Sequence, residues 1–366
     1  MAVKFWLRRL FKHIDPPLVG MLLVLLALST AVVYSASGGS DDKLFAHFAN
    51  MAVAVAAMLL MTMLPPQRLM QFALPIYVLG VVLLVGVAVA GDVVNGARRW
   101  LNLGVTRIQP SELMRLGVPL MLAWYLHVRH EFLSGRDFAV AALLLLLPVG
   151  LILKQPDLGT AMLISASGFY VLFLGGLSWR VLAAGAVGLA AFIPVAWRYL
   201  LHDYQRQRVL TMLDPSSDPL GAGYHIIQAT IAVGSGGLSG KGWMHGTQTH
   251  LDFLPEGSTD FIFAVYSEEF GLLGNLVLLL LYSGIIWRGL TLAVNASTQF
   301  GRLLSGSIVL TFFTYAFVNM GMVSGILPVV GVPLPLVSYG GTSMVTVMVG
   351  FGIVMSLAAH KKLVKT

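Results

Sequence analysis

The stretch LDFLPEGSTDFIFAVYSEEF, residues 251–270, closes the only long polar segment of an otherwise very apolar chain. Within it Asp260 precedes the apolar residues 261–263, so its carboxyl group stands at the mouth of a predicted membrane helix. Apolar neighbours strip water from a carboxylate, and desolvation makes it a better base than a solvated one. The alternative is that Thr259 or Asp260 only caps the helix, because Ser, Thr and Asp are preferred there.

The composition indicates a membrane protein. Of the 366 residues 57% are apolar and only 11% are charged, and the mean hydropathy is +0.83. A soluble chain is usually about a quarter charged, so this one cannot hide its apolar surface in one core. The net charge of +7 is explained by basic cytoplasmic loops rather than by nucleic acid. No cysteine is present, which excludes disulfides and thiolate-metal sites.

The apolar runs predict an all-α polytopic membrane protein, a single domain over residues 1–366 with about ten transmembrane helices. A basic, amphipathic start at residues 1–17 is expected to lie on the lipid surface. A cleaved signal peptide is the alternative for the first span, and nine further spans argue against it. The runs lie at residues 18–34, 45–64, 69–90, 112–128, 138–153, 159–175, 181–200, 271–287, 303–323 and 341–359.

Charge asymmetry predicts the orientation. With both termini in the cytoplasm, the inner segments carry more Lys and Arg than the outer ones, and the outer segments carry most of the acids. Residues 201–270 then form a long periplasmic segment between helices 7 and 8. The protein is accordingly expected in the bacterial cytoplasmic (inner) membrane.

Several basic residues break this trend by lying on the outer side. Cations at the outer headgroup level suit an anionic lipid or a diphosphate. The alternative is ordinary pairing with outer acids or lipid phosphates. These residues are Arg98, Arg99, Arg107, Arg115, Lys154, Arg206, Arg208 and Lys241.

Two predicted helix starts share a pattern, Gln109-Pro110-Ser111-Glu112 and Gln155-Pro156-Asp157. Proline is favoured at the first helical position and an acid is favoured in the first turn, which gives both acids a purely structural interpretation. The topology, however, places both acids on the outer side with Asp260, and ionisable groups at membrane depth are functional candidates. Glu112 and Arg115, three residues apart, are expected to share a helix face.

The last outer loop, residues 322–341, is apolar but interrupted by three prolines. Irregular backbone at membrane depth is tolerated only where it packs on protein or lines a cavity. We therefore expect this loop to form a re-entrant wall of the same outward cavity. No Walker A motif, Gly-x-Ser-x-Gly elbow or zincin motif occurs, so neither ATP nor a serine nucleophile is indicated, and no metal ligands are assigned.

Four stretches in order, residues 96–112, 155–163, 234–263 and 325–341, resemble the SEDS family of bacterial membrane proteins. Residues 202–228, together with 329–332, favour its cell-elongation branch over its division branch. The resemblance covers nearly the whole chain. It implies a ten-helix peptidoglycan glycosyltransferase that polymerises lipid II, an undecaprenyl-diphosphate-linked disaccharide pentapeptide. It also implies a class B penicillin-binding protein and other elongation-complex membrane proteins as partners in cell-wall synthesis.

The resemblance assigns the essential aspartate to Asp260 and the supporting acids to Glu112 and Asp157. Substrate binding is predicted for Arg98, Arg99, Gln109, Arg115 and Lys241, chiefly as cations for the diphosphate. The family commonly has Lys where this chain has Arg115. The positive charge is kept, but an arginine could not fill a role that needs a neutral amine. Whether a divalent cation assists stays open.

Two other function classes remain. A lipid II flippase would use the same cavity and cations without covalent chemistry, and charges along an inward pathway would favour it. A scaffold for the elongation machinery needs no cavity acids and explains Asp260 poorly. The predicted mid-helix spans are nearly free of charge, which favours the glycosyltransferase.

Overall fold

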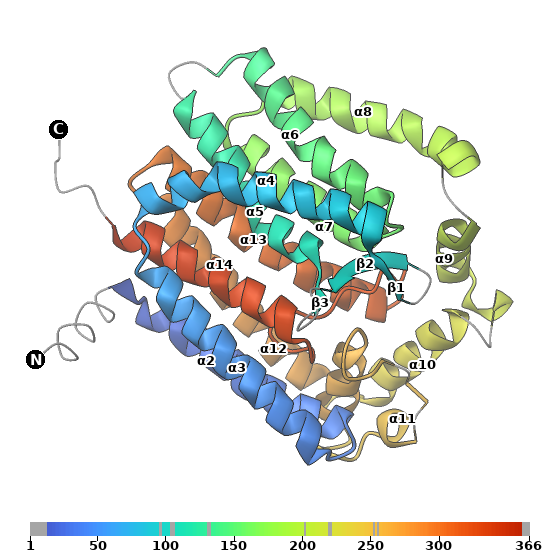
Figure 1. Ribbon diagram of the computed structural model, residues 1–366. Coiled ribbons are helices and arrows are strands. Elements are labelled where there is room, and N and C mark those ends of the chain that lie inside the picture. Colours follow the sequence, from blue (N-terminus) through green and yellow to red (C-terminus); the bar gives the residue numbers. More distant parts are fainter. Residues whose placement is uncertain are drawn as a thin grey trace, which may run out of the picture.

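The structure is a computed structural model that describes residues 13–94, 97–102, 107–129, 133–200, 203–218, 222–251, 253–254 and 256–360. The basic residues of the predicted amphipathic start, up to Lys12, lie outside these residues. Ten long helices occupy the positions of the ten predicted spans (Figure 1). They are α2 (Pro16–Ala36), α3 (Asp41–Thr62), α4 (Pro66–Ala90), α5 (Pro110–Val128), α6 (Gly135–Leu153), α7 (Leu158–Leu174), α8 (Trp179–Val195), α12 (Ile262–Val294), α13 (Gln299–Val323) and α14 (Gly341–Ala359).

Eight of the ten helices in the described part are long and apolar enough to cross a membrane. The two that fall short are α5 and α7. By length and apolar composition, eight of the ten predicted spans therefore qualify as membrane-spanning helices. Helix α7 is apolar but has 17 residues. Helix α5 carries Glu112, Arg115 and His127, and it packs against α4, α6, α7, α13 and α14, which shield its polar groups from lipid.

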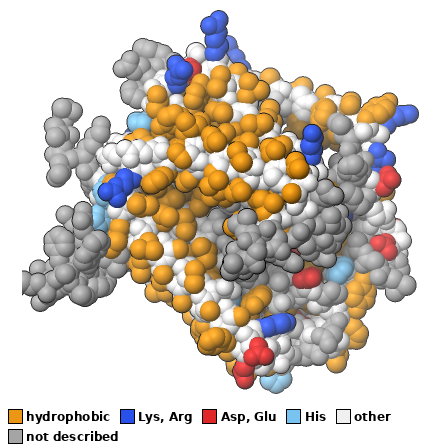
Figure 2. Space-filling view, in the orientation of Figure 1, with side chains coloured by type: hydrophobic (Ala, Val, Ile, Leu, Met, Phe, Trp, Pro, Cys, Tyr) orange, Lys and Arg blue, Asp and Glu red, His pale blue; other side chains and the backbone are white. Residues whose placement is uncertain are grey.

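The core lies around α13. This helix contacts α5, α7, α12 and α14, while α14 packs along α3 and α2 packs along α12. Fully buried side chains such as Phe300, Phe351 and Leu122 fill the space between them. Hydrophobic side chains cover the middle of the face in Figure 2, and Lys, Arg, Asp and Glu lie mainly toward its margins, as expected for a chain in a bilayer. Helix α8 differs from the others because none of its described side chains is buried in the protein.

The two ends of the described chain meet. The rings of His13 and His360 stack with centroids 4.7 Å apart. Nearby, Asp15 caps α2 by accepting from the Leu18 amide, and it also pairs with Arg288 of α12 at 2.7 Å. An even number of crossings brings both ends to one side, so this contact agrees with the predicted topology.

The polar connections contain structure that the sequence did not predict. A small antiparallel sheet is formed by β1 (Asp92–Val94), β2 (Ala97–Asn102) and β3 (Arg107–Ile108), with Asp92 opposite Trp100 and Leu101 opposite Ile108. The long outer segment holds α9 (Asp203–Leu213), α10 (Ala222–Ser235) and α11 (Thr247–His250), with a 3-10 turn at Pro215–Ser217. A π-helical turn, Ala196–Leu200, extends α8.

Helix α12 is interrupted at Gly271, whose φ of 64° and ψ of −161° are not helical. A Cβ on this residue would lie 2.3 Å from the Gly240 nitrogen and 2.9 Å from the Gly236 oxygen, so only glycine fits. The predicted eighth span began at residue 271, which coincides with this break. The nine residues before it, 262–270, form a separate short helix that begins two residues after Asp260.

Candidate active site

Asp260 lies in the turn just before α12. The residue that caps this helix is Phe261, and no side chain makes the capping hydrogen bond. The Thr259 hydroxyl instead donates to the backbone oxygen of Glu256 at 3.2 Å and to its carboxylate at 2.7 Å. The interpretation of Thr259 or Asp260 as a helix cap is therefore wrong, and the Asp260 carboxyl group needs another explanation.

The Asp260 side chain faces a cavity of about 530 Å³. Seven segments that are far apart in the sequence line it: β2, the starts of α5, α7 and α14, one face of α9, the turn around Asp260 and the loop after α13. Of the predicted site residues the cavity brings together Arg99, Gln109, Glu112, Arg115, Asp157 and Asp260. The remaining lining residues are Trp100, Pro156, Leu158, Gly159, Thr160, Gln205, Arg208, Val209, Thr259, Pro328, Val329, Val330, Gly331, Pro333, Tyr339, Gly340, Thr342 and Ser343.

The pKa of Asp260 is raised from its ordinary value to about 6. Burial of the carboxyl group is the largest cause, and the nearby Glu256 carboxylate raises the pKa further, whereas Arg208 lowers it. A carboxylate with a pKa near 6 is mostly ionised at neutral pH but holds a proton more strongly than a solvated aspartate. This is the protonation behaviour required of a general base.

Glu112 and Arg115 share a face of α5, as predicted, and form an ion pair with Arg115 Nη1 2.8 Å from Glu112 Oε2. The Thr346 hydroxyl lies 3.4 Å from the same carboxylate oxygen. Arg115 also donates to Ser343 at 3.3 Å, and its guanidinium carbon lies 4.9 Å from the centre of the Tyr315 ring. These contacts fix the charge of Arg115 at one edge of the cavity.

Asp157 serves as the N-cap of α7, accepting from the Thr160 amide at 3.1 Å. Its other oxygen lies 3.7 Å from Arg99 Nε, and Arg99 also donates to the Pro156 carbonyl at 2.9 Å. Asp157 thus caps α7 and does not lie in its first turn as predicted, and the same side chain still lines the cavity.

The two prolines of the repeated pattern behave differently. Pro110 takes the first position of α5, directly after Gln109, as predicted. Pro156 instead precedes the cap of α7 and has a φ of 23°, so its predicted place at the first helical position is wrong. The expectation failed because Asp157 takes the capping role itself, so the helix starts at Leu158, two residues after Pro156.

The loop after α13 forms one wall of the cavity, as its prolines predicted. Pro328, Gly331 and Pro333 line the space. Gly331 has a φ of 71°, and a Cβ on it would lie 3.3 Å from Asp260 Oδ2. The loop backbone therefore passes within contact distance of the candidate base.

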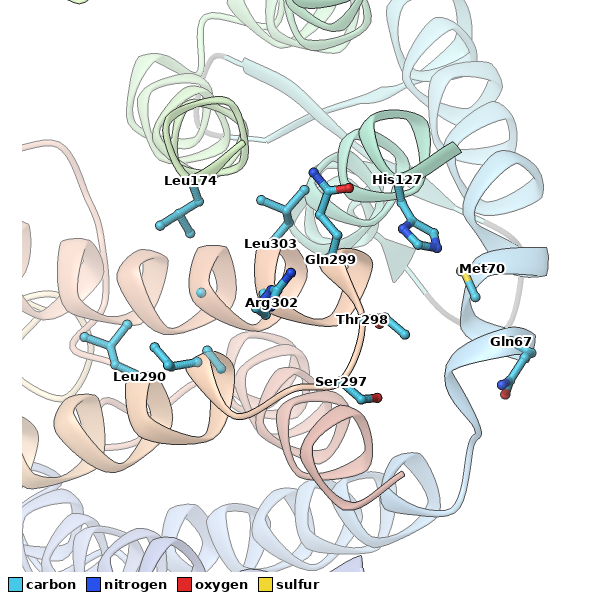
Figure 3. A pocket seen from close by; sticks show the side chains of 13 residues that line it. Gln67, Met70, His127, Leu174, Leu290, Ser297, Thr298, Gln299, Arg302 and Leu303 are labelled. Carbon is cyan, nitrogen blue, oxygen red and sulfur yellow. The ribbon is translucent and has the colours of Figure 1, made fainter. Parts of the chain in front are cut away.

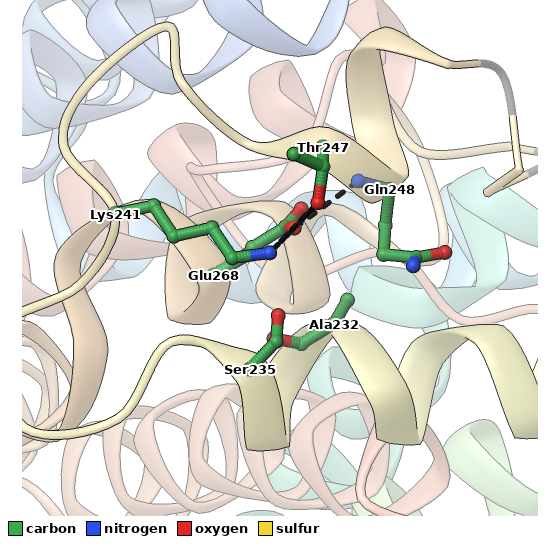
Figure 4. A network of polar contacts seen from close by, with 6 residues as sticks. All are labelled: Ala232, Ser235, Lys241, Thr247, Gln248 and Glu268. Atoms are coloured by element: carbon green, nitrogen blue, oxygen red, sulfur yellow. Dashed lines mark hydrogen bonds and ion pairs between the residues drawn. The ribbon is translucent and has the colours of Figure 1, made fainter.

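Lys241 lies elsewhere. Its ammonium group pairs with Glu268 at 2.6 Å and donates to the Thr247 hydroxyl at 2.7 Å (Figure 4). Glu268 also accepts from the Gln248 amide, so the pair holds the loop around α11 against α12. Neither Lys241 nor Glu268 is among the residues that line the cavity, and the geometry gives this lysine a structural contact rather than a place beside Asp260.

The structure adds Gln205, Arg208 and Ser343 to the predicted residues. The sequence did mark Arg208 as a candidate cation, since it was one of the basic residues of the outer segment. Nothing in the sequence, however, placed α9 over the cavity. The side chain of Arg98 lies outside the described part of the chain. Within the described ranges, no group of three or more His, Cys, Asp or Glu side chains is arranged to hold a metal ion.

A larger cavity, about 830 Å³, lies at the opposite ends of α5, α7 and α13 (Figure 3). It is lined by Arg302, His127 and Gln299 among mainly apolar residues, and no acid lines it. A carboxylate base for sugar transfer is therefore available in the Asp260 cavity, whereas among the described residues of this one only His127 could act as a base.

Comparison with known proteins gives consistent matches over nearly the whole chain. Residues 16–363 match the model of the FtsW, RodA and SpoVE family, described as cell cycle protein. The chain is 52% identical over 351 residues to peptidoglycan glycosyltransferase MrdB of Escherichia coli K12, covering 96% of this chain and 95% of that protein. It is 32% identical to stage V sporulation protein E of Bacillus subtilis, covering 95% and 98% of the two chains.

Solved structures agree. One, described as the structural coordination of polymerization and crosslinking by a peptidoglycan synthase complex, matches with a TM-score of 0.80 and 36% identity, over 94% of this chain and 97% of that chain. The rod shape determining protein RodA of Thermus thermophilus matches with a TM-score of 0.71 and 31% identity, over 94% and 96%.

Proposed function

This chain belongs to the SEDS family of FtsW, RodA and SpoVE proteins, and from that premise we propose that it is a RodA-type peptidoglycan glycosyltransferase with Asp260 as its general base. The relatives that carry this activity in their names match it from end to end. Its substrate in this proposal is lipid II, and its product is the glycan strand made during cell elongation.

The reaction joins two sugars and releases a lipid diphosphate. A hydroxyl group of the acceptor sugar attacks the anomeric carbon of the donor, and the bond from that carbon to the diphosphate oxygen breaks. The hydroxyl proton passes to the Asp260 carboxylate, and the electron pair of the broken bond leaves with undecaprenyl diphosphate. A single base with in-line displacement gives inversion at the anomeric carbon.

The cations of the cavity act on the leaving group. A diphosphate gains negative charge as the bond breaks, and fixed positive charges stabilise that change. Arg115 is held in place by Glu112, Ser343 and Tyr315, and Arg99 and Arg208 line the same space. Glu112 and Asp157 act by orienting Arg115 and Arg99 rather than by taking the proton.

The observation that carries this proposal is the carboxyl group of Asp260, which faces a cavity lined with arginines and has a pKa raised to about 6. The test is Asp260→Asn, with purified protein, its partner and lipid II. Asn keeps the size of the side chain but cannot accept the proton, so polymerisation should fall by about 10²- to 10⁴-fold. Near-normal glycan synthesis by this variant would rule out Asp260 as the base.

The same preparation distinguishes a glycosyltransferase from a lipid II flippase. A transporter makes and breaks no bond, so Asp260→Asn could leave lipid II translocation intact while glycan synthesis is lost. Translocation that depends on Asp260, with no glycan product in the unmodified protein, would support the flippase instead.

The partner and the location follow from the same premise. One structural match is described as a complex that coordinates polymerization and crosslinking. We accordingly infer that this polymerase acts with a class B penicillin-binding protein in the bacterial inner membrane. Its termini lie in the cytoplasm and its Asp260 cavity opens outward, where lipid II is polymerised.

A further inference from the structure

Asn319 of α13 contacts the backbone of Asp260 directly. Its side chain is fully buried, and its amide nitrogen donates to the Asp260 carbonyl at 2.8 Å and to the Val332 carbonyl at 2.7 Å. A side-chain amide nitrogen carries two hydrogens, and both are used here. Because both neighbours are carbonyl oxygens, the nitrogen and not the oxygen of this amide must face them.

The two carbonyls belong to two neighbouring walls of the cavity. Asp260 lies on the turn before α12, and Val332 lies on the loop after α13. Two further contacts join the same walls: Ser338 donates to the Thr259 carbonyl at 2.6 Å, and the Tyr339 amide donates to the Ser258 carbonyl at 2.9 Å. Of these contacts, that of Asn319 alone reaches the backbone of Asp260 itself.

We propose that Asn319 is a positioning residue for catalysis, which fixes the Asp260 carboxyl group against the loop wall through its two backbone carbonyls. This inference rests on the assignment of Asp260 as the base. It assigns a mechanistic role to an uncharged residue that does not line the cavity, and it does not require Asn319 to touch substrate.

The short distance between the loop and the Asp260 carboxyl group explains why the position of this carboxyl group matters. The Gly331 backbone passes Asp260 so closely that a Cβ there would be 3.3 Å from Asp260 Oδ2. A base must lie within hydrogen-bond reach of the proton that it takes, and a displacement of about 1 Å can cost on the order of 10²-fold in rate. Releasing the loop from the Asp260 turn would permit a displacement of that size.

Releasing the loop would also admit water to the carboxyl group. Burial is the largest cause of its raised pKa, Glu256 adds to the increase and Arg208 opposes it. The other charged groups that line the cavity are Arg99, Glu112, Arg115 and Asp157, and they belong to elements that Asn319 does not tie. Loss of the Asn319 contacts should therefore move the pKa of Asp260 downward from about 6.

The test compares Asn319→Leu with a matched control on the same helix. Ser307→Ala also removes a fully buried side chain that donates to a backbone carbonyl, that of Ser167 at 2.7 Å, but near the other end of α13. Both variants should lower thermal stability. In the full complex with lipid II, Asn319→Leu should lower turnover per folded protein by on the order of 10- to 100-fold. The acidic limb of its pH–rate profile, where activity falls as Asp260 takes up a proton, should move to lower pH. Ser307→Ala should leave both unchanged.

A second variant and a distance measurement keep the test decisive if Asn319→Leu folds poorly. Asn319→Gln keeps both donor hydrogens on a longer side chain and should retain more turnover than Asn319→Leu. The chain has no cysteine, so spin labels at Ser258→Cys, on the turn that carries Asp260, and at Ile326→Cys, on the loop after α13, report the separation of the two walls. Asn319→Leu should broaden the distance distribution between these labels, and Ser307→Ala should not.

An acidic limb that does not move, with activity lost only in proportion to folded protein, would overturn the positioning role. Asp260→Asn is measured in the same series. If Asp260→Asn is active, the assignment of the base fails. If Asp260→Asn is inactive while Asn319→Leu keeps normal turnover, the base stands and only this inference fails.

Discussion

Arg115 and Glu112 form an ion pair of 2.8 Å in which both side chains are largely removed from solvent, 11% and 13% exposed. An arginine in this pair is already neutralised before any diphosphate arrives. A departing diphosphate must therefore share the guanidinium with Glu112, and a planar guanidinium with five N–H donors can do this. The pair thus orients a cation at the cavity edge and leaves part of its hydrogen-bonding capacity for the substrate.

Replacing Arg115 should test this directly. Arg115→Ala should lower turnover by about 10²- to 10³-fold, because the contact strengthens as the leaving group gains charge. Arg115→Lys keeps the charge and should retain much more activity. Steady-state polymerisation rates with lipid II provide the measurement. The matched control is Arg302→Ala in the opposite cavity, which should keep normal turnover. An Arg115→Ala enzyme with normal turnover would assign this arginine to structure.

The pH dependence of polymerisation should report Asp260. A general base works as the carboxylate, so activity should be nearly constant above its pKa of about 6 and should fall as pH drops below that value. The Glu256 carboxylate raises this pKa. Glu256→Gln should therefore move the acidic limb to lower pH, whereas Asp214→Asn, remote from the cavity, should not. A limb that stays near the ordinary aspartate value in the unmodified enzyme contradicts the assignment.

The topology can be measured with an impermeant thiol reagent. The chain has no cysteine, and Ser216 and Ser297 are exposed in connections on opposite sides of the predicted bilayer. Ser216→Cys should be labelled from outside in intact cells, and Ser297→Cys only after the membrane is opened. Labelling of Ser297→Cys from outside would refute the proposed orientation.

The partner should co-purify. A class B penicillin-binding protein with one membrane span should remain bound in native lipid at a one-to-one ratio. The exposed apolar side chains of the chain are compatible with contacts inside the bilayer. Failure of the two folded proteins to associate in native lipid would count against the proposed complex.

Much of the helical architecture could be predicted from the apolar runs. Bilayer-spanning segments are long, apolar and bounded by polar residues, so α4 and α14 begin and end within a few residues of their predicted ranges. The sheet of β1–β3 could not be predicted, because its strands are short, contain three Arg residues and depend on pairing with one another. Helix α9 was missed because polar sequence carries little periodic signal, and α10 was missed because its 14 residues, although largely apolar, are too few to span a membrane.

The site was predictable where helix starts share one side of the membrane. Glu112, Asp157 and Asp260 each precede or begin a helix on that side, so topology alone brought them together. Lys241 was predicted as a cation of the long outer segment, yet it pairs with Glu268, because the sequence does not reveal which acid a cation will contact. Asn319 could not be recognised, since a buried amide in an apolar helix gives no sign of the carbonyls that it contacts.

The break at Gly271 limits the part of α12 that can span the membrane. A straight helix with the 33 residues of α12 would be about 50 Å long, far more than the hydrocarbon core of about 30 Å. The part after Gly271, residues 272–294, is about 34 Å long and matches that thickness. The outer boundary of the hydrocarbon therefore falls near residue 272. The break therefore ends the membrane span at this point, and residues 262–269, which lead from the Asp260 turn to the break, are buried in the protein instead of continuing the span.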